Sequence, residues 1–154
     1  MRSDQTKANT KLVIFDLDGV LIQENRDYTL EEVLNPLSEF IKEICDEGIN
    51  FAIITGRRDD EVIESIKEYN IRIINASLNK VSNAEELIDE LKIDFSEVFF
   101  MGDDILDIPL LQKVGYSAAP KNARREVKRV VQEIIPANDV DLMLKKIKSM
   151  VLNK

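Results

Sequence analysis

Short apolar segments alternate with longer amphipathic segments along most of this chain. Five apolar segments are too short for helices and rich in strand-forming side chains, so they predict buried strands. Between them and after the last one, apolar residues recur at intervals of three and four, as on helices that bury one face. The predicted strands cover residues 11–15, 51–54, 71–74, 98–101 and 116–118, and the predicted helices include residues 30–45, 60–69, 82–91 and 139–152.

Capping residues predict where several of these helices begin. Thr29-Leu-Glu-Glu32 and Ser82-Asn-Ala-Glu85 are each typical of a capping box, in which two side chains bind free backbone N–H groups of the first turn. Asn122 is expected to cap a further helix that runs to Val131. Cys45 lies on the apolar side of the first helix, so we expect it in the core.

The alternation of strands and helices is typical of an α/β protein. It predicts a Rossmann-like three-layer αβα sandwich, in which helices cover both faces of a mainly parallel sheet. No internal repeat, linker or change of composition divides the chain. We therefore predict one domain over residues 11–154, preceded by a flexible polar leader at residues 1–10.

The net negative charge of the chain limits the classes of partner that it is expected to bind. Its 154 residues include 21 Lys and Arg against 29 Asp and Glu, which gives a net charge of −8. A field of that sign repels nucleic acid and anionic membrane surfaces. The sequence has no apolar stretch of about 18 residues that predicts a membrane span, and residues 1–10 lack the apolar segment of a secretion signal. These features predict a cytoplasmic protein that binds neither nucleic acid nor membrane.

Two residue types that are scarce or missing limit the chemistry further. The chain contains no histidine and a single cysteine. Histidine-based triads, histidine-ligated zinc and internal disulfides are therefore excluded. Any catalysis has to use carboxylates, lysine, hydroxyl groups or a hard cation.

Acidic residues follow two of the predicted strands. Asp16 and Asp18 come directly after the first strand, and Gly102-Asp103-Asp104-Ile-Leu-Asp107 follows the fourth. Because ligands bind at the carboxyl ends of strands in open α/β sheets, we expect these carboxylates to converge. Turn formation and helix capping explain some of them, but like charges about 4 Å apart repel by roughly 4 kcal/mol at an effective dielectric near 20. Such a cluster favours Mg²⁺, which takes oxygen ligands and accepts substrate phosphate.

Two further elements are candidates for phosphate binding. Thr55-Gly56-Arg57, at the end of the second predicted strand, offers a hydroxyl, a permissive backbone and a guanidinium group. On its own it is also a common turn sequence. Lys80 precedes a predicted helix, and a single lysine is most often a solvated surface residue.

Together these elements are more specific. In order, DLDGV, ITGR, a single lysine and GDDILD resemble the four-motif signature of the haloacid dehalogenase superfamily of phosphohydrolases, over residues 11–138. The chain resembles in particular the small capless phosphatases that act on 3-deoxy-manno-octulosonate 8-phosphate or nonulosonate 9-phosphates. The similarity rests on DLDGVL, on the spacing from Lys80 to Asp103 and on the run GDDILDIPLLQKVGYSAAPKNA. The short distance from Asp16 to Thr55 leaves room for a short flap and no cap domain.

The resemblance implies Mg²⁺-dependent hydrolysis of a phosphate monoester through an aspartyl-phosphate. It implies that Asp16 attacks phosphorus, and that Asp18 protonates the leaving alcohol and then activates water. It also implies that Thr55 and Lys80 hold the phosphoryl oxygens. The metal ligands it implies are Asp16, the main-chain carbonyl of Asp18 and Asp103, with Asp104 and Asp107 behind them orienting waters and Lys80, and with Gly56 and Arg57 as substrate contacts.

Three departures from the family pattern bear on the substrate and the assembly. Leu21-Ile-Gln-Glu-Asn25 stands where the family has a Thr-Asp-Gly hairpin, and Asn75-Ala-Ser-Leu-Asn79 replaces a glutamine-glycine pair. Asn138-Asp139 leads into the last predicted helix, where the family has a glycine-rich tail with an arginine. The substrate implied is a small acidic sugar phosphate. The assembly implied is a homo-oligomer, a tetramer in the family, with a flap at Leu21–Tyr28 or a neighbouring subunit covering the site.

Three alternatives stay open at this point. A receiver-type signalling domain also carries an acidic cluster, a hydroxyl and a lysine, but its acidic pair lies at the first strand and its lysine late in the chain. A phosphatase of the same superfamily with another substrate class is the second. A non-catalytic subunit that retains the fold is the third, and the intact motif residues argue against it.

Overall fold

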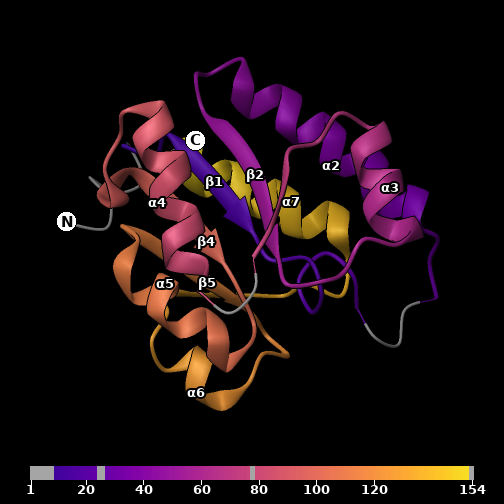
Figure 1. Cartoon of the computed structure of the whole chain (residues 1–154). Coiled ribbons are helices and arrows are strands. Elements are labelled where there is room, and N and C mark those ends of the chain that lie inside the picture. The colour runs from indigo at the N-terminus through magenta and orange to yellow at the C-terminus, as the bar shows by residue number, and fades with distance from the viewer. Residues whose placement is uncertain (1–8, 24–26, 77–78, 153–154) are drawn as a thin grey trace.

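One parallel β-sheet runs through the middle of the protein. The computed structural model describes residues 9–23, 27–76 and 79–152, and within them six strands form a sheet in the order β3-β2-β1-β4-β5-β6 (Figure 1). Every neighbouring pair is parallel. The strands are β1 (Leu12–Phe15), β2 (Asn50–Thr55), β3 (Ile73–Asn75), β4 (Val98–Met101), β5 (Tyr116–Pro120) and β6 (Glu133–Ile135).

Helices cover both faces of this sheet, which confirms the predicted three-layer fold. Long helix α2 (Leu30–Cys45) lies beside α7 (Val140–Leu152) on one face, where α3 (Glu61–Glu68) also packs. The other face is covered by α4 (Lys80–Leu91), α5 (Ile108–Lys113) and α6 (Arg125–Lys128). Two 3₁₀ turns flank β4, at Phe95–Glu97 and Ile105–Asp107.

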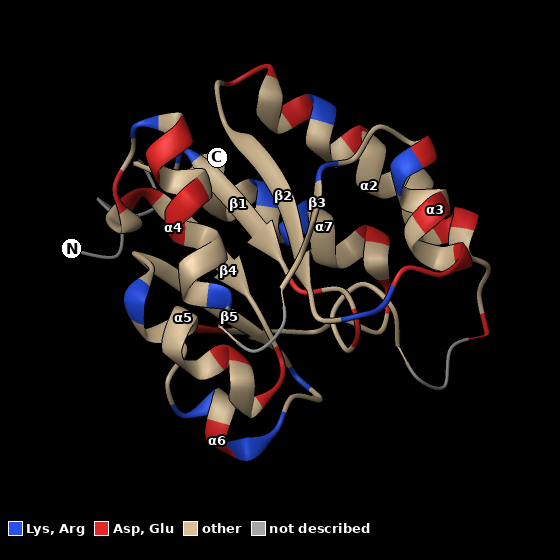
Figure 2. Ribbon diagram, viewed as in Figure 1, with Lys and Arg blue, Asp and Glu red and all other residues tan. Residues whose placement is uncertain are grey.

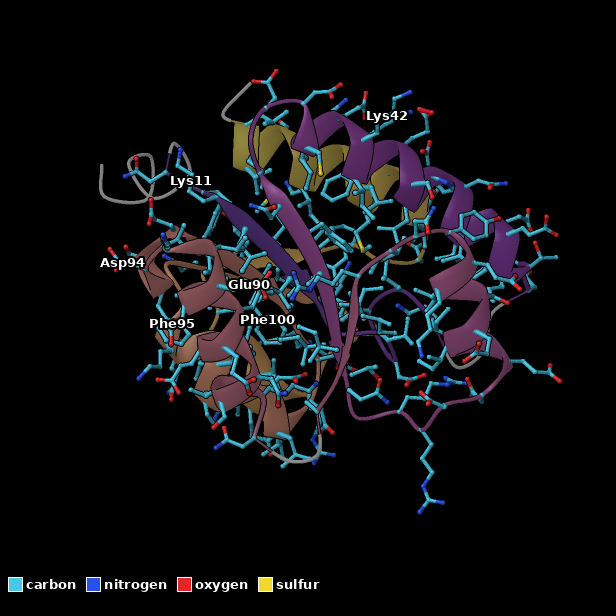
Figure 3. The ribbon with its side chains drawn as sticks, turned by 45° about the horizontal axis from the view of Figure 1, so that its top comes forward. Lys11, Lys42, Glu90, Asp94, Phe95 and Phe100 are labelled. Carbon is cyan, nitrogen blue, oxygen red and sulfur yellow. The ribbon has the colours of Figure 1, made fainter. Side chains whose placement is uncertain are left out.

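The central strand β1 is enclosed on both faces. Its side chains alternate between two apolar cores: Val13 and Phe15 face α2 and α7, whereas Leu12 and Ile14 face α4 and α5. Charged residues lie on the helices and loops, and the strands carry almost none (Figure 2). In Figure 3, Lys42 lies on the outer side of α2, whereas Phe100 points into the core. A polar residue that follows β1 therefore emerges from a fully buried strand at the edge of the sheet.

Two capping predictions have different outcomes. The box at α2 is confirmed, since Thr29 accepts from the backbone of Glu32 and the Glu32 side chain binds the Thr29 backbone. The box predicted at Ser82 is wrong: Asn79 is the N-cap of α4, and its side chain accepts from the Ser82 N–H at 3.2 Å. Asparagine caps helices as well as serine does. The helix therefore begins earlier than predicted, and Lys80 is its first residue.

In the C-terminal half, one prediction is wrong and one strand was not predicted. Asn122 caps no helix, because α6 begins after Arg124 without a side-chain cap and the Asn122 amide binds Gln23 instead. The sheet also has a sixth strand, β6, which pairs with β5. Its sequence, Glu-Ile-Ile, is too short and too mixed in polarity to predict a strand.

Cys45 is exposed, contrary to the expectation that it lies in the core. It is the last residue of α2, where Phe40 and Ile44 take the positions that face the sheet. Because side chains four apart share one face of a helix, the next residue along points away from that face.

The segment between β1 and α2 spans residues 16–29, and the part of it that the structure describes contains no cap domain. Residues 24–26 of the predicted flap and residues 1–8 of the predicted leader lie outside the described residues. Among the helices of the described residues, none is long and apolar enough to cross a membrane.

Candidate active site at the carboxyl edge of the sheet

A cavity opens where the central strands end. Its volume is about 750 Å³, within the range of pockets that bind small molecules. Its walls come from the segments that follow β1, β2, β4 and β5, together with the first residue of α4. The lining residues are Asp16, Asp18, Gly19, Ile22, Gln23, Thr55, Gly56, Arg57, Lys80, Asp103, Asp104, Leu106 and Asn122.

Three carboxylates converge at one point of this site. Asp16, Asp103 and Asp107 each offer an oxygen, and these atoms lie within 4.8 Å of one another. Burial and the charge of Asp107 raise the pKa of Asp16 to about 8, against the opposing effect of Lys80. Burial and Asp107 also raise the pKa of Asp103 to about 6. When these buried carboxyl groups ionise, the nearby charge of Lys80 does not offset all of them, and an all-oxygen donor set of this kind fits a hard divalent cation such as Mg²⁺.

Asp107 ties this cluster to Lys80. Its Oδ1 lies 2.5 Å from the Lys80 Nζ, and its Oδ2 accepts the backbone N–H groups of Asp103 at 3.0 Å and Asp104 at 3.1 Å. Both oxygens of this fully buried side chain are therefore occupied by bonds to the protein. Asp107 holds its neighbours in place, whereas Asp16 and Asp103 face the cavity.

Lys80 brings a positive charge to the carboxylates. Its Nζ lies 3.2 Å from the Asp16 Oδ1 as well as contacting Asp107, and the side chain is buried. Burial by itself lowers the pKa of Lys80, but Asp16 and Asp107 outweigh it and leave this pKa above its ordinary value. Lys80 is therefore not a solvated surface lysine, because α4 begins early enough to carry it to the edge of the sheet.

Gly19 allows the loop after β1 to approach Asp103. Its φ is +86°, a left-handed conformation that favours glycine. A Cβ at this position would lie 1.7 Å from the Asp103 Oδ2. The loops after β1 and β4 therefore meet at a contact that only a residue without a side chain permits.

Asp18 lies apart from the three converging carboxylates. Its Oδ1 is 2.6 Å from the Arg57 Nη1, and the Arg57 Nε binds Asp60 at 2.8 Å. About half of the Asp18 side chain is exposed. Arg57 therefore joins the loop after β1 to the loop after β2 and keeps the Asp18 carboxylate on the solvent side of the cavity.

Thr55 and Asp104 have their backbone neighbours as partners. The buried Thr55 Oγ1 accepts the Arg57 N–H at 3.0 Å, which leaves its own proton for a group in the cavity. Asp104 caps the 3₁₀ turn that follows it, and its Oδ1 accepts the Ile105 N–H at 2.7 Å. Of the two acidic residues expected to orient Lys80, Asp107 is the one in contact with it.

Comparison with known proteins identifies the family. A profile of the haloacid dehalogenase-like hydrolases matches residues 13–73 and 62–147. The chain belongs to this family. The assignment decides against the receiver-domain alternative, and it agrees with the resemblance of the four motifs.

Curated relatives of this haloacid dehalogenase-like hydrolase include 3-deoxy-D-manno-octulosonate 8-phosphate phosphatases of several bacteria. The chain is 32% identical over 125 residues to the 3-deoxy-D-manno-octulosonate 8-phosphate phosphatase KdsC of Salmonella typhi, and 31% identical over 121 residues to that of Escherichia coli K12. The matches cover 77% and 75% of this chain. They cover 66% and 64% of the relatives, so the chain spans just under two thirds of their length.

Solved structures share the fold. A probable YrbI family phosphatase from Pseudomonas syringae matches with a TM-score of 0.80 and 27% identity, covering 99% of this chain and 90% of that one. The 3-deoxy-D-manno-octulosonate 8-phosphate phosphatase of Moraxella catarrhalis, solved with magnesium ion, phosphate ion and KDO, matches with a TM-score of 0.79 and 25% identity. That match covers 98% of this chain and 92% of the other.

The site of this hydrolase contains residues that the sequence did not single out. Gln23 and Asn122 line the cavity, as do the apolar residues Ile22 and Leu106. Gln23 stands in the segment that departs from the family pattern, and Asn122 was assigned to a helix cap. No motif marks either residue, because their proximity arises from loops 99 positions apart in the chain.

Proposed function

We propose that this haloacid dehalogenase-like hydrolase cleaves phosphate monoesters and that Asp16 is its nucleophile. The contact of the buried Lys80 with Asp16 is the observation that carries the proposal. A fixed ammonium group beside a carboxylate stabilises the negative charge of a phosphoryl group as the two approach. The Thr55 hydroxyl, in the same cavity, supplies a second donor for the phosphoryl oxygens.

The donor set supports a magnesium ion at this site. Asp16, Asp103 and the main-chain carbonyl of Asp18 would hold the ion, and Asp107 would fix Asp103 from behind. When bound, Mg²⁺ offsets the charge of the carboxylates and of the phosphoryl group. The raised pKa of Asp16 and of Asp103 supports this role, since such carboxyl groups lose their protons more readily when a cation binds.

The residues divide the reaction into two displacements. In the first, an Asp16 oxygen attacks phosphorus, the bond from phosphorus to the leaving oxygen breaks, and Asp18 gives that oxygen a proton. In the second, water attacks the phosphorus of the aspartyl-phosphate, Asp18 takes the water proton, and phosphate leaves Asp16. We place Asp18 in this role because it lines the same cavity as Asp16 and about half of its side chain is exposed, so it can reach an oxygen that enters from solvent.

The relatives support a small acidic sugar phosphate as substrate. Their name specifies 3-deoxy-D-manno-octulosonate 8-phosphate, and the Moraxella catarrhalis structure holds a KDO molecule with phosphate. The cavity of about 750 Å³ has room for a sugar beyond its phosphoryl group. Gly56 and Arg57 line the side of the cavity nearest β2 and are the proposed substrate contacts.

A neighbouring copy of the chain is the proposed cover for the cavity. Leu106 lines the cavity and is 52% exposed, and the adjacent Ile105 is 42% exposed. Apolar side chains gathered beside a reaction site favour contact with another protein surface. Sedimentation at micromolar concentration tests this part, and a monomer with full selective activity would contradict it.

A phosphatase screen with site variants tests the function. The panel holds octulosonate 8-phosphate, a nonulosonate 9-phosphate, hexose phosphates, nucleotides, a phosphopeptide and phenyl phosphate, each with Mg²⁺ and with EDTA. We expect hydrolysis that EDTA abolishes, essentially no turnover by Asp16→Asn and severe loss in Asp18→Asn, with melting temperatures showing that both variants fold.

Three results would contradict parts of this proposal. Full activity after exhaustive chelation would contradict the proposed role of Mg²⁺. Near-wild-type turnover by Asp16→Asn would contradict the mechanism through an aspartyl-phosphate. A hundredfold preference for a phosphopeptide or nucleotide, roughly 2.7 kcal/mol of transition-state binding, would leave a phosphatase of another substrate class.

A further inference from the structure

Two side-chain amides join the loop after β1 to the loop after β5 at the edge of the cavity. The Asn122 Nδ2 donates to the Gln23 Oε1 at 2.9 Å, and both residues line the cavity. This contact spans 99 positions of the chain. It is the side-chain hydrogen bond that connects these two walls directly among the described residues.

The orientation of Gln23 is fixed on several sides. Its Nε2 donates to the carbonyl oxygens of Gly19 and Val20, each at 3.1 Å, so both amide protons are in use. Its backbone N–H donates to the Tyr28 hydroxyl at 3.0 Å. The Oε1 is therefore the atom that faces Asn122, and it acts as an acceptor.

This arrangement leaves Asn122 with open hydrogen-bonding groups. Binding to Gln23 takes one Nδ2 proton and orients the amide. The other Nδ2 proton and the Oδ1 make no further side-chain hydrogen bond among the described residues, and Asn122 is exposed. A donor and an acceptor side by side are the complement of an alcohol, which both donates and accepts.

The sheet order puts Asn122 and Arg57 on opposite sides of the reacting group. Asn122 follows β5 and Arg57 follows β2, whereas Asp16 follows β1, which lies between them. A phosphoryl group held by Asp16 and Lys80 therefore has a cation on one side and an uncharged amide on the other. The room beyond the phosphoryl group extends to that amide.

We propose that Asn122 binds a hydroxyl group of the leaving alcohol and that Gln23 is the positioning residue that orients it. The inference rests on the proposed phosphatase function and deepens it. It makes the substrate a phosphate ester of a polyhydroxylated alcohol, recognised on the β5 side by a neutral hydrogen-bonding group. An aryl phosphate lacks the hydroxyl group to which the Asn122 amide would hydrogen-bond.

The test compares substrates with and without hydroxyl groups. Wild type, Asn122→Ala, Gln23→Ala and the double variant are assayed with octulosonate 8-phosphate, glucose 6-phosphate and phenyl phosphate. The quantity compared is a ratio: kcat/KM for the sugar phosphate that wild type prefers, divided by kcat/KM for phenyl phosphate. We expect this ratio to fall about tenfold in each single variant, as for the loss of one hydrogen bond. The double variant should fall no further, because the two amides act as one unit. Gln112→Ala, which removes an exposed amide on α5, should leave the ratio unchanged.

Each outcome decides the matter. An unchanged ratio in Asn122→Ala, or an equal loss with both substrate types, overturns the role of Asn122, even if the enzyme is a phosphatase. Additive losses in the double variant overturn the positioning role of Gln23. If wild type hydrolyses phenyl phosphate but no sugar phosphate, the inference fails while the phosphatase function stands. If wild type hydrolyses nothing, the proposed function fails and the inference falls with it.

Discussion

Gly19 and Gly48 form a natural pair for separating backbone strain from active-site contact. Both have a positive φ, +86° and +83°. A Cβ on Gly19 would collide with the Asp103 carboxylate, whereas a Cβ on Gly48 would have nothing within 4 Å. Alanine is strained at both positions, by about 1–2 kcal/mol.

We therefore expect Gly19→Ala and Gly48→Ala to lose similar amounts of free energy of unfolding through backbone strain. We expect them to differ in activity and in Mg²⁺ binding. Gly19→Ala has to displace Asp103, so it should lose most of its phosphatase activity and bind Mg²⁺ more weakly. Gly48→Ala should retain both. Denaturant unfolding and Mg²⁺ titration of the two variants measure this difference, and equal Mg²⁺ affinities would contradict the role given to the Asp103 contact.

At the scale of single residues, sequence predicts the site where a residue follows a strand. Asp16 directly follows β1, Thr55 is the last residue of β2, Asp103 lies two positions after the end of β4, and the structure brings all three to one cavity. Gln23 and Asn122 could not be predicted in this way, because the hydrogen bond between them depends on the paths of two loops. The exposure of Cys45 was also not predicted, because Ile44, the residue before it, takes the buried position at the end of α2 and Cys45 points away from the sheet.

Among the elements, α4 has the most direct link to chemistry, because Lys80 is its first residue. Asn79→Ala removes the side chain that accepts the Ser82 N–H, and we expect a loss of about 1 kcal/mol in the free energy of unfolding. Fraying of the first turn should also lower kcat, since it loosens Lys80. Thr29→Ala is the matched control: it removes the cap of α2, so we expect a similar loss of stability with unchanged kinetics.

Thermal unfolding and steady-state kinetics of both cap variants decide the point. If Asn79→Ala lost stability and kept its full kcat, the start of α4 would not control the position of Lys80.

Buried elements are easier to predict than exposed ones. The segment Val98–Met101 is apolar throughout and forms β4 as predicted, because a strand covered on both faces has to be apolar throughout. The strand β6 lies at the edge of the sheet, and its Ile134 is 48% exposed. Only part of such a strand needs to be apolar, so its sequence carries a weak signal.

For the molecule as a whole, the raised carboxyl pKa values predict a dependence of stability on pH. Burial raises the pKa of Asp16 to about 8 and that of Asp103 to about 6. Without metal, the folded protein therefore holds more protons than the unfolded chain between about pH 4 and pH 8. Unfolding releases these protons, so the contribution of the two groups to the free energy of unfolding falls as pH rises through that window.

Between pH 5 and pH 8 in EDTA, the melting temperature of wild type should therefore fall relative to that of Asp103→Asn, which lacks one of the titrating groups. Added Mg²⁺ should stabilise wild type more at pH 8 than at pH 5, because protons compete with the metal at low pH. If the rise in melting temperature on adding Mg²⁺ does not grow with pH, the assignment of these carboxylates as ligands is contradicted.

The central position of β1 has a consequence for how the chain is made. Leu12 pairs with Asn50 on one side but with Val98 on the other, so the second neighbour of β1 is synthesised much later than the first. Until β4 leaves the ribosome, an apolar strand has one unpaired edge, and such edges promote aggregation. A chain that ends at residue 95 should therefore pellet on centrifugation under conditions that keep the longer chain in solution. Asp103 and Asp107 also arrive after this point, so the nascent chain acquires its sheet and its chemistry at the same stage of translation.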